Sequence, residues 1–277
     1  DKELVATLKA LKEQLNQLLL QSISDDNTRN EVVQALIDRT LYIKYLEDNH
    51  IINSYFFGHY FNDTTLNYEK LLENNTKKDI NELYSIIHEI FNNSLFDTPK
   101  IDEKYLTNEV CNIIAKSFNH NISTGQLRLF DFRFDVLPVE FISYIYEVFL
   151  SEKQKENGIY YTPKKLAQLI IDDVIKDDRI GSILDPSSGS GMFLITGYQR
   201  LLEIAQKQKL EPQDSIGKIK YRTKLLSENI FGIEKELTAQ RFTLFSLSLQ
   251  IFIGINPEEI KYFISKELKD NKNINLF

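Results

Sequence analysis

The segment Ile183-Leu-Asp-Pro-Ser-Ser-Gly-Ser-Gly-Met-Phe-Leu194 constrains the fold more than any other part of this 277-residue chain. A short apolar run ends in an acid, Asp185, and continues into a turn that contains Gly189 and Gly191 and opens a helical stretch from Met192 to Gln206. Glycines in such a turn let the backbone approach a ligand closely, and the N–H groups of the following helix point at that ligand. The segment therefore predicts a strand, a turn and a helix that border a ligand site.

Several interpretations of this turn compete. A phosphate-binding P-loop requires a Gly-Lys-Ser/Thr sequence, and the turn has no lysine. A dinucleotide-binding turn requires a third glycine where Leu194 stands, and Gly197 comes too late. In a site for a ligand without phosphates, Asp185 would meet a cationic group and the glycines would admit an amino-acid moiety, which fits S-adenosylmethionine. An ordinary strand-to-helix turn without a ligand also remains open.

A second strand is predicted at Asn229-Ile-Phe-Gly-Ile-Glu234, again followed by a helical stretch. Strands that alternate with helices are typical of a parallel sheet with crossover helices. Glu234 ends this strand, where it can accept hydrogen bonds from both hydroxyls of a ribose or be an ordinary solvated strand end. The segment Leu244–Ile255 also alternates like a strand, and its period alone does not separate strand from helix. Leu268–Phe277 is expected to begin a third strand.

The first part of the chain has the pattern of helices. An apolar stripe at three- and four-residue steps, followed by further helical patterns at 32–46, 80–91, 109–118 and 138–150, predicts an all-α bundle. The first stripe consists of Leu4, Leu8, Leu11, Leu15 and Leu18. The polar run 151–157 then marks either a linker or a frayed helix end. We therefore expect an N-terminal helical domain at 1–150, a linker at 151–157 and an α/β domain at 158–277.

Charge and composition agree with two different domains and exclude several classes of protein. Residues 1–157 carry 16 Lys and Arg against 25 Asp and Glu, whereas residues 158–277 carry 17 against 15, so the net charge of −7 divides into −9 and +2. The single Cys, Cys111, excludes a disulfide framework and a cysteine-based metal site, and the four His have no metal-ligand spacing. We expect a cytoplasmic protein, because no apolar run is long enough to span a membrane and the first ten residues contain no secretory signal.

A third motif, Gly158-Ile-Tyr-Tyr-Thr-Pro163, precedes an apolar-periodic helical segment. Thr162 is expected to be the N-cap of this helix and Pro163 its first residue. Together with Leu184–Leu194 and Phe231-Gly-Ile-Glu234, this motif closely resembles three ordered motifs of the adenine-specific, S-adenosylmethionine-dependent DNA methyltransferases of restriction–modification systems. The likeness is to the large modification subunits and to the fused restriction–methylation proteins. Asp38–Glu47 and Val136–Glu147 resemble segments of the helical domain of the same proteins.

The resemblance implies a helical bundle followed by the first part of a doubly wound, Rossmann-like methyltransferase sheet. It also implies which residues bind S-adenosylmethionine, and it implies no metal. The implied residues are Tyr160, Thr162 and Pro163 at the methionine end of the cofactor; Asp185, Pro186, Ser188, Gly189, Gly191 and Phe193 in the turn beneath it; and Glu234 and Ile233 at its ribose and adenine.

The chain departs from this family in two ways. Gly191 and Glu234 are 43 positions apart, whereas the ribose acid usually follows such a turn by about 20 residues; residues 206–228 are therefore an insertion or an extended helix pair, or another acid binds the ribose. The Asn/Asp-Pro-Pro-aromatic tetrapeptide, which in this family draws out the lone pair of the adenine amine, is also absent: Asp185-Pro186 and Asn256-Pro257 are not followed by Pro-aromatic. The chain is thus expected to be an N-terminal part that lacks the catalytic residues.

The function that the resemblance implies for the full-length protein is transfer of a methyl group from S-adenosylmethionine to N6 of adenine in DNA. Double-stranded DNA, contacted mainly by regions beyond this chain, and a specificity or nuclease subunit are the expected partners. Two alternatives stay open. One is methylation of a nitrogen in RNA or protein, and the other is a non-catalytic module that docks a specificity or nuclease subunit.

Overall fold

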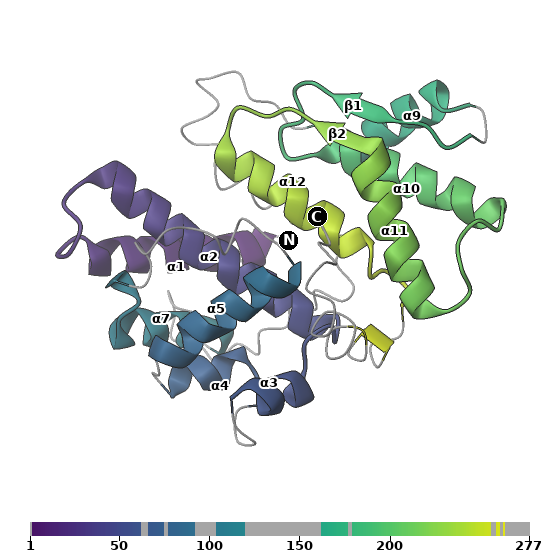
Figure 1. The fold of residues 1–277 in the computed structure, drawn as a ribbon. Helices are drawn as coiled ribbons and strands as arrows, with labels where there is room; N and C mark the ends of the chain where they lie inside the picture. Colours follow the sequence, from purple (N-terminus) through teal and green to yellow (C-terminus); the bar gives the residue numbers. More distant parts are fainter. Residues whose placement is uncertain are drawn as a thin grey trace. The chain divides into compact units, whose positions relative to one another are not determined.

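The computed structural model describes residues 2–61, 66–74, 77–91, 104–119, 162–176, 179–255, 259–260 and 263. The chain divides into two compact units (Figure 1). The first comprises Asp1–Glu89 and Ser94–Leu137, and the second comprises Ile90–Asn93 and Pro138–Phe277. The helix expected at 138–150 and the linker expected at 151–157 lie outside the described residues.

The regular elements in the described part of the first unit are helices. They are α1 (Lys2–Leu19), α2 (Asp26–Asp48), α3 (Ser54–Tyr60), α4 (Tyr68–Glu73), α5 (Lys77–Phe91) and α7 (Asn108–Asn119). Several begin at the capping residues that their sequences provide: Asp25 accepts a hydrogen bond from the Thr28 N–H at the start of α2, and Asn53 and Asn67 cap α3 and α4. In neither unit is a described helix long and apolar enough to cross a bilayer.

Packing in the first unit follows the predicted apolar stripes. α1 packs against α2 and α7, and α4 packs against α7. Leu4, Leu8, Leu11 and Leu15 are buried, as predicted, while Leu19 takes the buried position expected for Leu18. Cys111 on α7 is also buried. The helices at 32–46, 80–91 and 109–118 are thereby confirmed, and their arrangement as a bundle stays a prediction.

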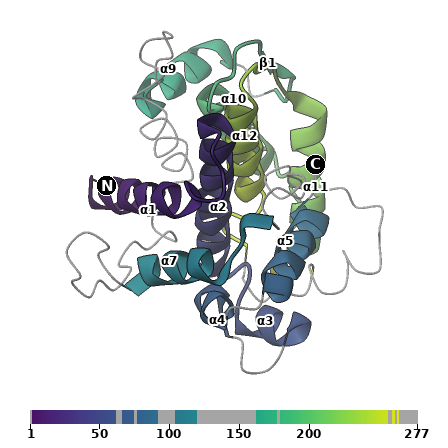
Figure 2. The same ribbon diagram turned by 90° about the vertical axis from the view of Figure 1, so that its left-hand side faces the viewer.

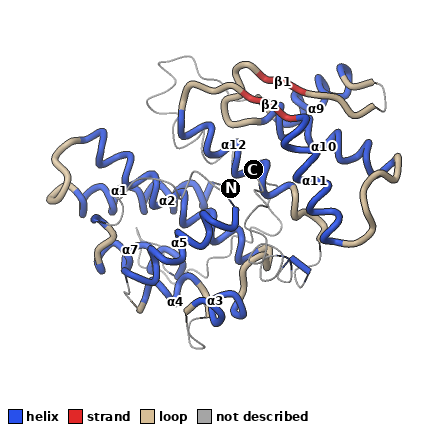
Figure 3. Tube along the Cα trace, in the orientation of Figure 1, coloured by secondary structure: helices blue, strands red, loops and turns tan. Residues whose placement is uncertain are grey.

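The second unit contains a small parallel sheet with helices. Its elements are α9 (Lys164–Val174), β1 (Ile183–Asp185), α10 (Met192–Lys207), α11 (Ser215–Asn229), β2 (Ile230–Gly232) and α12 (Leu237–Gln250). The two strands lie side by side in Figure 3 and are parallel, with Leu184 opposite Phe231. Two consecutive helices, α10 and α11, form the crossover between them, which explains the long spacing between the glycine turn and Glu234.

The helix α10 is the centre of this unit. It contacts α9, α12 and both strands, and Figures 1 and 2 show α10 beside α9 and α12 from two directions. A glycine allows the close approach of α10 to β1, because a Cβ on Gly197 would lie 2.8 Å from the Ile183 Cδ1 atom. Since α10 begins at the glycine turn, its packing fixes where that turn lies relative to both strands.

The structure decides one open expectation and corrects another. The segment Leu244–Ile255, whose period left strand and helix open, is the second half of α12 followed by a turn at 251–254. Pro163, expected as the first residue of α9, instead occupies the N-cap position, because its ψ of 137° is extended and its carbonyl accepts the Ala167 N–H; Thr162 makes no side-chain cap. The third strand expected at Leu268–Phe277 lies outside the described residues.

Candidate cofactor-binding site

The glycine turn between β1 and α10 has a fixed backbone conformation. The Asp185 carboxylate accepts a hydrogen bond from the Ser187 N–H over 3.0 Å, which bends the chain immediately after the strand. The Gly191 N–H then donates to the Ser188 carbonyl over 2.8 Å. Gly189 and Gly191 have φ angles of +52° and +84°, in the left-handed region that glycine enters at little cost. The sequence thus carries glycine at the two positions of the turn where this backbone requires it.

Gly191 is required for a second reason. It is the N-cap residue of α10, and its carbonyl accepts the Ile195 N–H over 2.8 Å. A Cβ at this position would lie 2.5 Å from the Cγ2 methyl of Thr243, a residue of α12. The side chain of Thr243 therefore occupies the space that any residue other than glycine would need.

The turn is joined to the end of β2 by backbone hydrogen bonds. The Ile233 N–H donates to the Asp185 carbonyl over 2.9 Å, and the Ser188 N–H donates to the Ile233 carbonyl over 3.0 Å. These bonds continue the parallel pairing beyond the last strand residues. Asp185, Ser188 and Ile233, which the sequence predicted to share one site, are consequently adjacent.

Glu234 lies against the same turn. One of its carboxylate oxygens, Oε2, accepts the Gly189 N–H over 2.8 Å, and the other, Oε1, accepts the Glu236 N–H over 2.8 Å. Glu236 in turn caps α12 through the Ala239 N–H. The acid at the end of the second strand is thus in contact with the glycine turn, although 45 positions separate Gly189 from Glu234.

The remaining predicted residues have fewer described contacts with the glycine turn, or lie outside the described residues. Pro186 is exposed in the turn, and Phe193 is half-buried in the first turn of α10. Thr162 and Pro163 directly precede α9, which packs on α10, and in the described part of the chain no hydrogen bond joins them to the glycine turn. Tyr160 lies outside the described residues.

The sequence did not indicate two residues of the site, one that contacts the turn and one that contacts Glu234. The Thr243 hydroxyl donates to the Gly189 carbonyl over 3.0 Å, and the Gln240 side-chain amide donates to the Glu234 carbonyl. Both belong to α12, where their spacing of three residues places them on one face. Recognising the helical spacing of the apolar residues Phe242, Phe245 and Leu249 would have predicted this helix, but not its contact with the turn.

Comparisons with known proteins agree with the motifs. The family model described as N-6 DNA Methylase matches residues 139–275. The type II restriction enzyme and methyltransferase RM.Eco57I of Escherichia coli is 23% identical over 269 residues, which cover 83% of this chain and 25% of that protein. The methylase subunit of the type I restriction enzyme MjaIX of Methanocaldococcus jannaschii is 41% identical over 61 residues, 21% of this chain and 11% of that subunit. No solved structure matches the chain.

These matches confirm the resemblance to the N6 DNA methyltransferases of restriction–modification systems. They also show that the chain spans only a quarter of the first relative and about a tenth of the second.

Proposed function

We propose that the glycine turn and Glu234 bind S-adenosylmethionine and that the full-length protein methylates N6 of adenine in DNA. The match of the N-6 DNA Methylase family model to residues 139–275 supports this proposal. The observation that carries the proposal is the hydrogen bond between the Gly189 N–H and the Glu234 carboxylate. It brings a glycine turn at the end of one parallel strand next to an acid at the end of the neighbouring strand. In open α/β sheets, ligands bind at this edge, outside the carboxyl ends of the strands.

The chemistry of these residues fits the cofactor. A carboxylate offers about four acceptor positions, and Glu234 uses two of them for the N–H groups of Gly189 and Glu236. The others can accept hydrogen bonds from the ribose hydroxyls. Apart from Gly189 itself and its two chain neighbours, no described residue has an atom within 4 Å of the position that a Cβ on Gly189 would occupy, so a ligand can approach the backbone there.

The other proposed contacts follow the polarity of the cofactor. Asp185 binds its ammonium group, since the hydrogen bond from Ser187, within the part of the chain that the structure describes, engages one carboxylate oxygen and leaves the other for the ligand. Ile233 packs on the adenine, and its side chain is 60% exposed at the site. Pro186, Ser188, Gly189, Gly191 and Phe193 line the turn, and Tyr160, Thr162 and Pro163 close the methionine end. When bound, the cofactor supplies an electrophilic methyl group.

Binding the cofactor is the part of the reaction that these residues perform. The adenine amine is a weak nucleophile, and acceptors that draw out its lone pair are expected in an Asn/Asp-Pro-Pro-aromatic tetrapeptide that this sequence does not contain. The proposed DNA methylation therefore belongs to the full-length protein. Double-stranded DNA, contacted mainly by regions beyond this chain, and a specificity or nuclease subunit are the proposed partners.

One face of the sheet carries exposed apolar side chains, which supports the proposal that this chain contains only part of the α/β domain. Leu184 and Phe231 are opposite each other in the register, and Ile233 follows on the same face. They are 61%, 46% and 60% exposed, whereas α10 covers the opposite face. Parallel sheets normally have helices on both faces, so we propose that further elements of a doubly wound sheet cover these side chains in the full-length protein.

Isothermal titration calorimetry of the full-length protein with S-adenosylmethionine tests the cofactor assignment. We expect binding that weakens at least about tenfold in Asp185→Ala and in Glu234→Ala, because each loses a charge-assisted hydrogen bond to the ligand. Asp173→Ala, at an exposed position of α9, is the matched control and should bind like the unmodified protein. Failure of the full-length protein to bind, or unchanged binding by Asp185→Ala, would refute the assignment.

A methyl-transfer assay tests the reaction. Incubation of the full-length protein with labelled cofactor and duplex DNA should give N6-methyladenine on nucleoside mass spectrometry. Label in RNA or protein instead of DNA would support the alternative substrates. Cofactor binding without transfer to any of the three would support a non-catalytic module.

A further inference from the structure

The side chain of Thr243 contacts both glycines of the turn. Its hydroxyl donates to the Gly189 carbonyl over 3.0 Å, and its Cγ2 methyl lies 2.5 Å from the position that a Cβ on Gly191 would take. Thr243 is 5% exposed, so water does not readily replace its hydroxyl as a donor. One buried side chain thus satisfies the turn with a polar group and fills the space beside it with an apolar one.

Both hydrogen-bonding groups of Gly189 are held from distant parts of the sequence. Its N–H donates to Glu234 at the end of β2, and its carbonyl accepts from Thr243 on α12. Glycine has wide freedom in φ and ψ, so an unrestrained Gly-Ser-Gly turn would populate many conformations. These two bonds select one orientation of the Gly189 backbone.

The start of α12 is fixed to the same acid. The Gln240 amide donates to the Glu234 carbonyl, one helical turn before Thr243. Glu236 caps the helix, and its own N–H donates to the Glu234 carboxylate. Gln240, Thr243 and Glu234 therefore form a continuous set of hydrogen bonds around Gly189.

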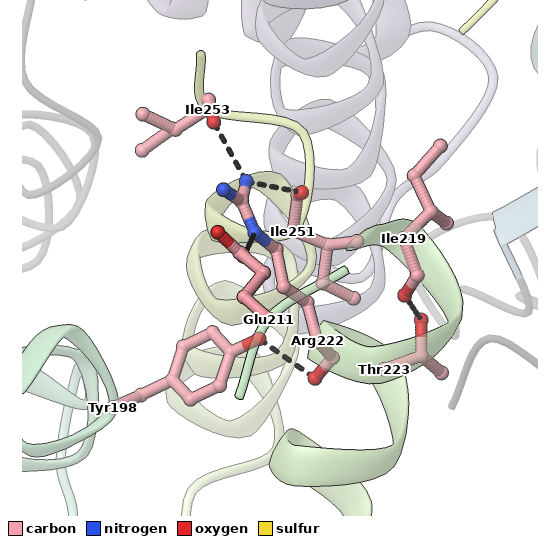
Figure 4. A network of polar contacts seen from close by, with 7 residues as sticks. All are labelled: Tyr198, Glu211, Ile219, Arg222, Thr223, Ile251 and Ile253. Atoms are coloured by element: carbon pink, nitrogen blue, oxygen red, sulfur yellow. Dashed lines mark hydrogen bonds and ion pairs between the residues drawn. The ribbon is translucent and has the colours of Figure 1, made fainter. Parts of the chain in front are cut away.

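The far end of α12 is anchored independently of the turn. Arg222 of α11 donates through Nη1 to the carbonyls of Ile251 and Ile253, over 2.9 and 2.7 Å, just after α12 ends (Figure 4). Its Nε donates to Glu211 over 2.5 Å, and the Tyr198 hydroxyl of α10 donates to the Arg222 carbonyl over 2.8 Å. A helix held at its far end can impose a position on the turn at its near end.

Resting on the proposed cofactor site, we propose that Thr243 is a positioning residue for cofactor binding. It acts through Gly189, whose backbone it holds in the orientation that presents the N–H to Glu234 and leaves the other side of the turn open to the amino-acid end of the cofactor. Thr243 does not itself touch the ligand. Its role is to prevent the turn from adopting conformations that do not bind.

Three variants separate this role from general stabilisation. Thr243→Val keeps the shape of the side chain and removes the hydroxyl, which leaves the half-buried Gly189 carbonyl without this donor. Thr243→Ser keeps the hydroxyl and removes the methyl. Thr223→Val is the matched control, because the Thr223 hydroxyl donates to the Ile219 carbonyl over 2.9 Å within α11, away from the turn (Figure 4).

Hydrogen exchange of the full chain without cofactor gives the first readout. In Thr243→Val, we expect the amides of Ser188, Gly189 and Gly191 to exchange about threefold to tenfold faster, the range that corresponds to one hydrogen bond. Thr243→Ser and Thr223→Val should retain the exchange rates of the unmodified chain at these amides. Unchanged exchange in Thr243→Val would overturn the proposal, whether or not the chain binds the cofactor.

Calorimetry of the full-length protein gives the second readout. The affinity for S-adenosylmethionine should fall about threefold to tenfold in Thr243→Val, recover in Thr243→Ser and stay unchanged in Thr223→Val. Equal affinities in Thr243→Val and Thr223→Val would overturn the positioning role. If the unmodified protein does not bind the cofactor, the proposed function fails, whereas faster exchange in Thr243→Val would still support control of the turn by Thr243.

Discussion

Removing the guanidinium of Arg222 should destabilise the second unit far more than removing both members of its ion pair. The side chains of Arg222 and Glu211 are only 6% and 8% exposed. Arg222→Met keeps an apolar stem of similar length but leaves the Glu211 carboxylate buried without its cation. It also deprives the Ile251 and Ile253 carbonyls of a donor.

The magnitude follows from these losses. Breaking a buried ion pair by removing one partner costs about 3–5 kcal/mol. The Ile251 residue is fully buried, so its carbonyl also loses a bond that water cannot easily replace. In the double variant Arg222→Met with Glu211→Leu no uncompensated charge remains, and the cost should fall to about 1–3 kcal/mol, that of the unsatisfied carbonyl.

Hydrogen exchange measured by mass spectrometry in increasing urea is the suitable assay. The chain has no Trp and forms two units, so a global optical signal would average them. Peptides from α11 and α12 report the second unit alone, and peptides from α2 provide an internal control that should not change. A cost below about 1 kcal/mol for Arg222→Met, or a double variant as unstable as the single one, would refute the assignment of the stability to this buried pair.

Three further predictions concern single sites. Gly191→Ala should destabilise the second unit by roughly 2 kcal/mol or more, because a left-handed φ is unfavourable for alanine and the added Cβ would clash with Thr243. Gly181→Ala is the control, because no described residue beyond its chain neighbours has an atom within 4 Å of a Cβ at that position. Equal urea midpoints for the two variants would contradict the prediction. Burial raises the pKa of the Glu47 carboxyl to about 7 from 4.5, although it accepts the Tyr68 N–H. The folded chain therefore binds a proton at Glu47 more tightly than the unfolded chain. The contribution of Glu47 to stability is fully present below about pH 4.5, and up to about 3 kcal/mol of it is lost as the pH rises through 7. Urea titrations at several pH values should show this loss in the unmodified chain and not in Glu47→Gln, and an equal pH dependence in both would contradict the prediction. Burial raises the pKa of the Cys111 thiol to about 11, so Ellman's reagent should react only as urea unfolds the chain, and rapid reaction in native buffer would contradict the buried placement.

Much of the fold could be read from local patterns. The stripe from Leu4 to Leu15, the caps at Asp25 and Asn53 and the two short strands are all encoded in residues close together in sequence. The helix α12 was harder to recognise, because it is buried on several sides. Such a helix has no single apolar stripe, and Ser246 and Ser248 between leucines imitate the alternation of a strand.

The candidate site divides in the same way. Asp185, Gly189 and Gly191 could be identified because the acid, the turn and the helix start are adjacent in the sequence. Glu234 could be identified as the end of a second strand, but its distance from the turn was longer than expected until α11 accounted for it. Thr243 carried no signal, since a threonine in an apolar helix is ordinary in sequence.

By itself the sequence determined the chemistry of the turn: two glycines where φ must be positive, and an acid at the end of each strand. Only the tertiary structure decided how the turn is held, with the Gly189 N–H on Glu234 and its carbonyl on Thr243, 54 positions away. The physical reason is that a positive φ depends on the residue at that position, so glycine in the sequence already indicates it. A hydrogen bond between distant residues depends on strand register and helix packing, which local patterns do not specify.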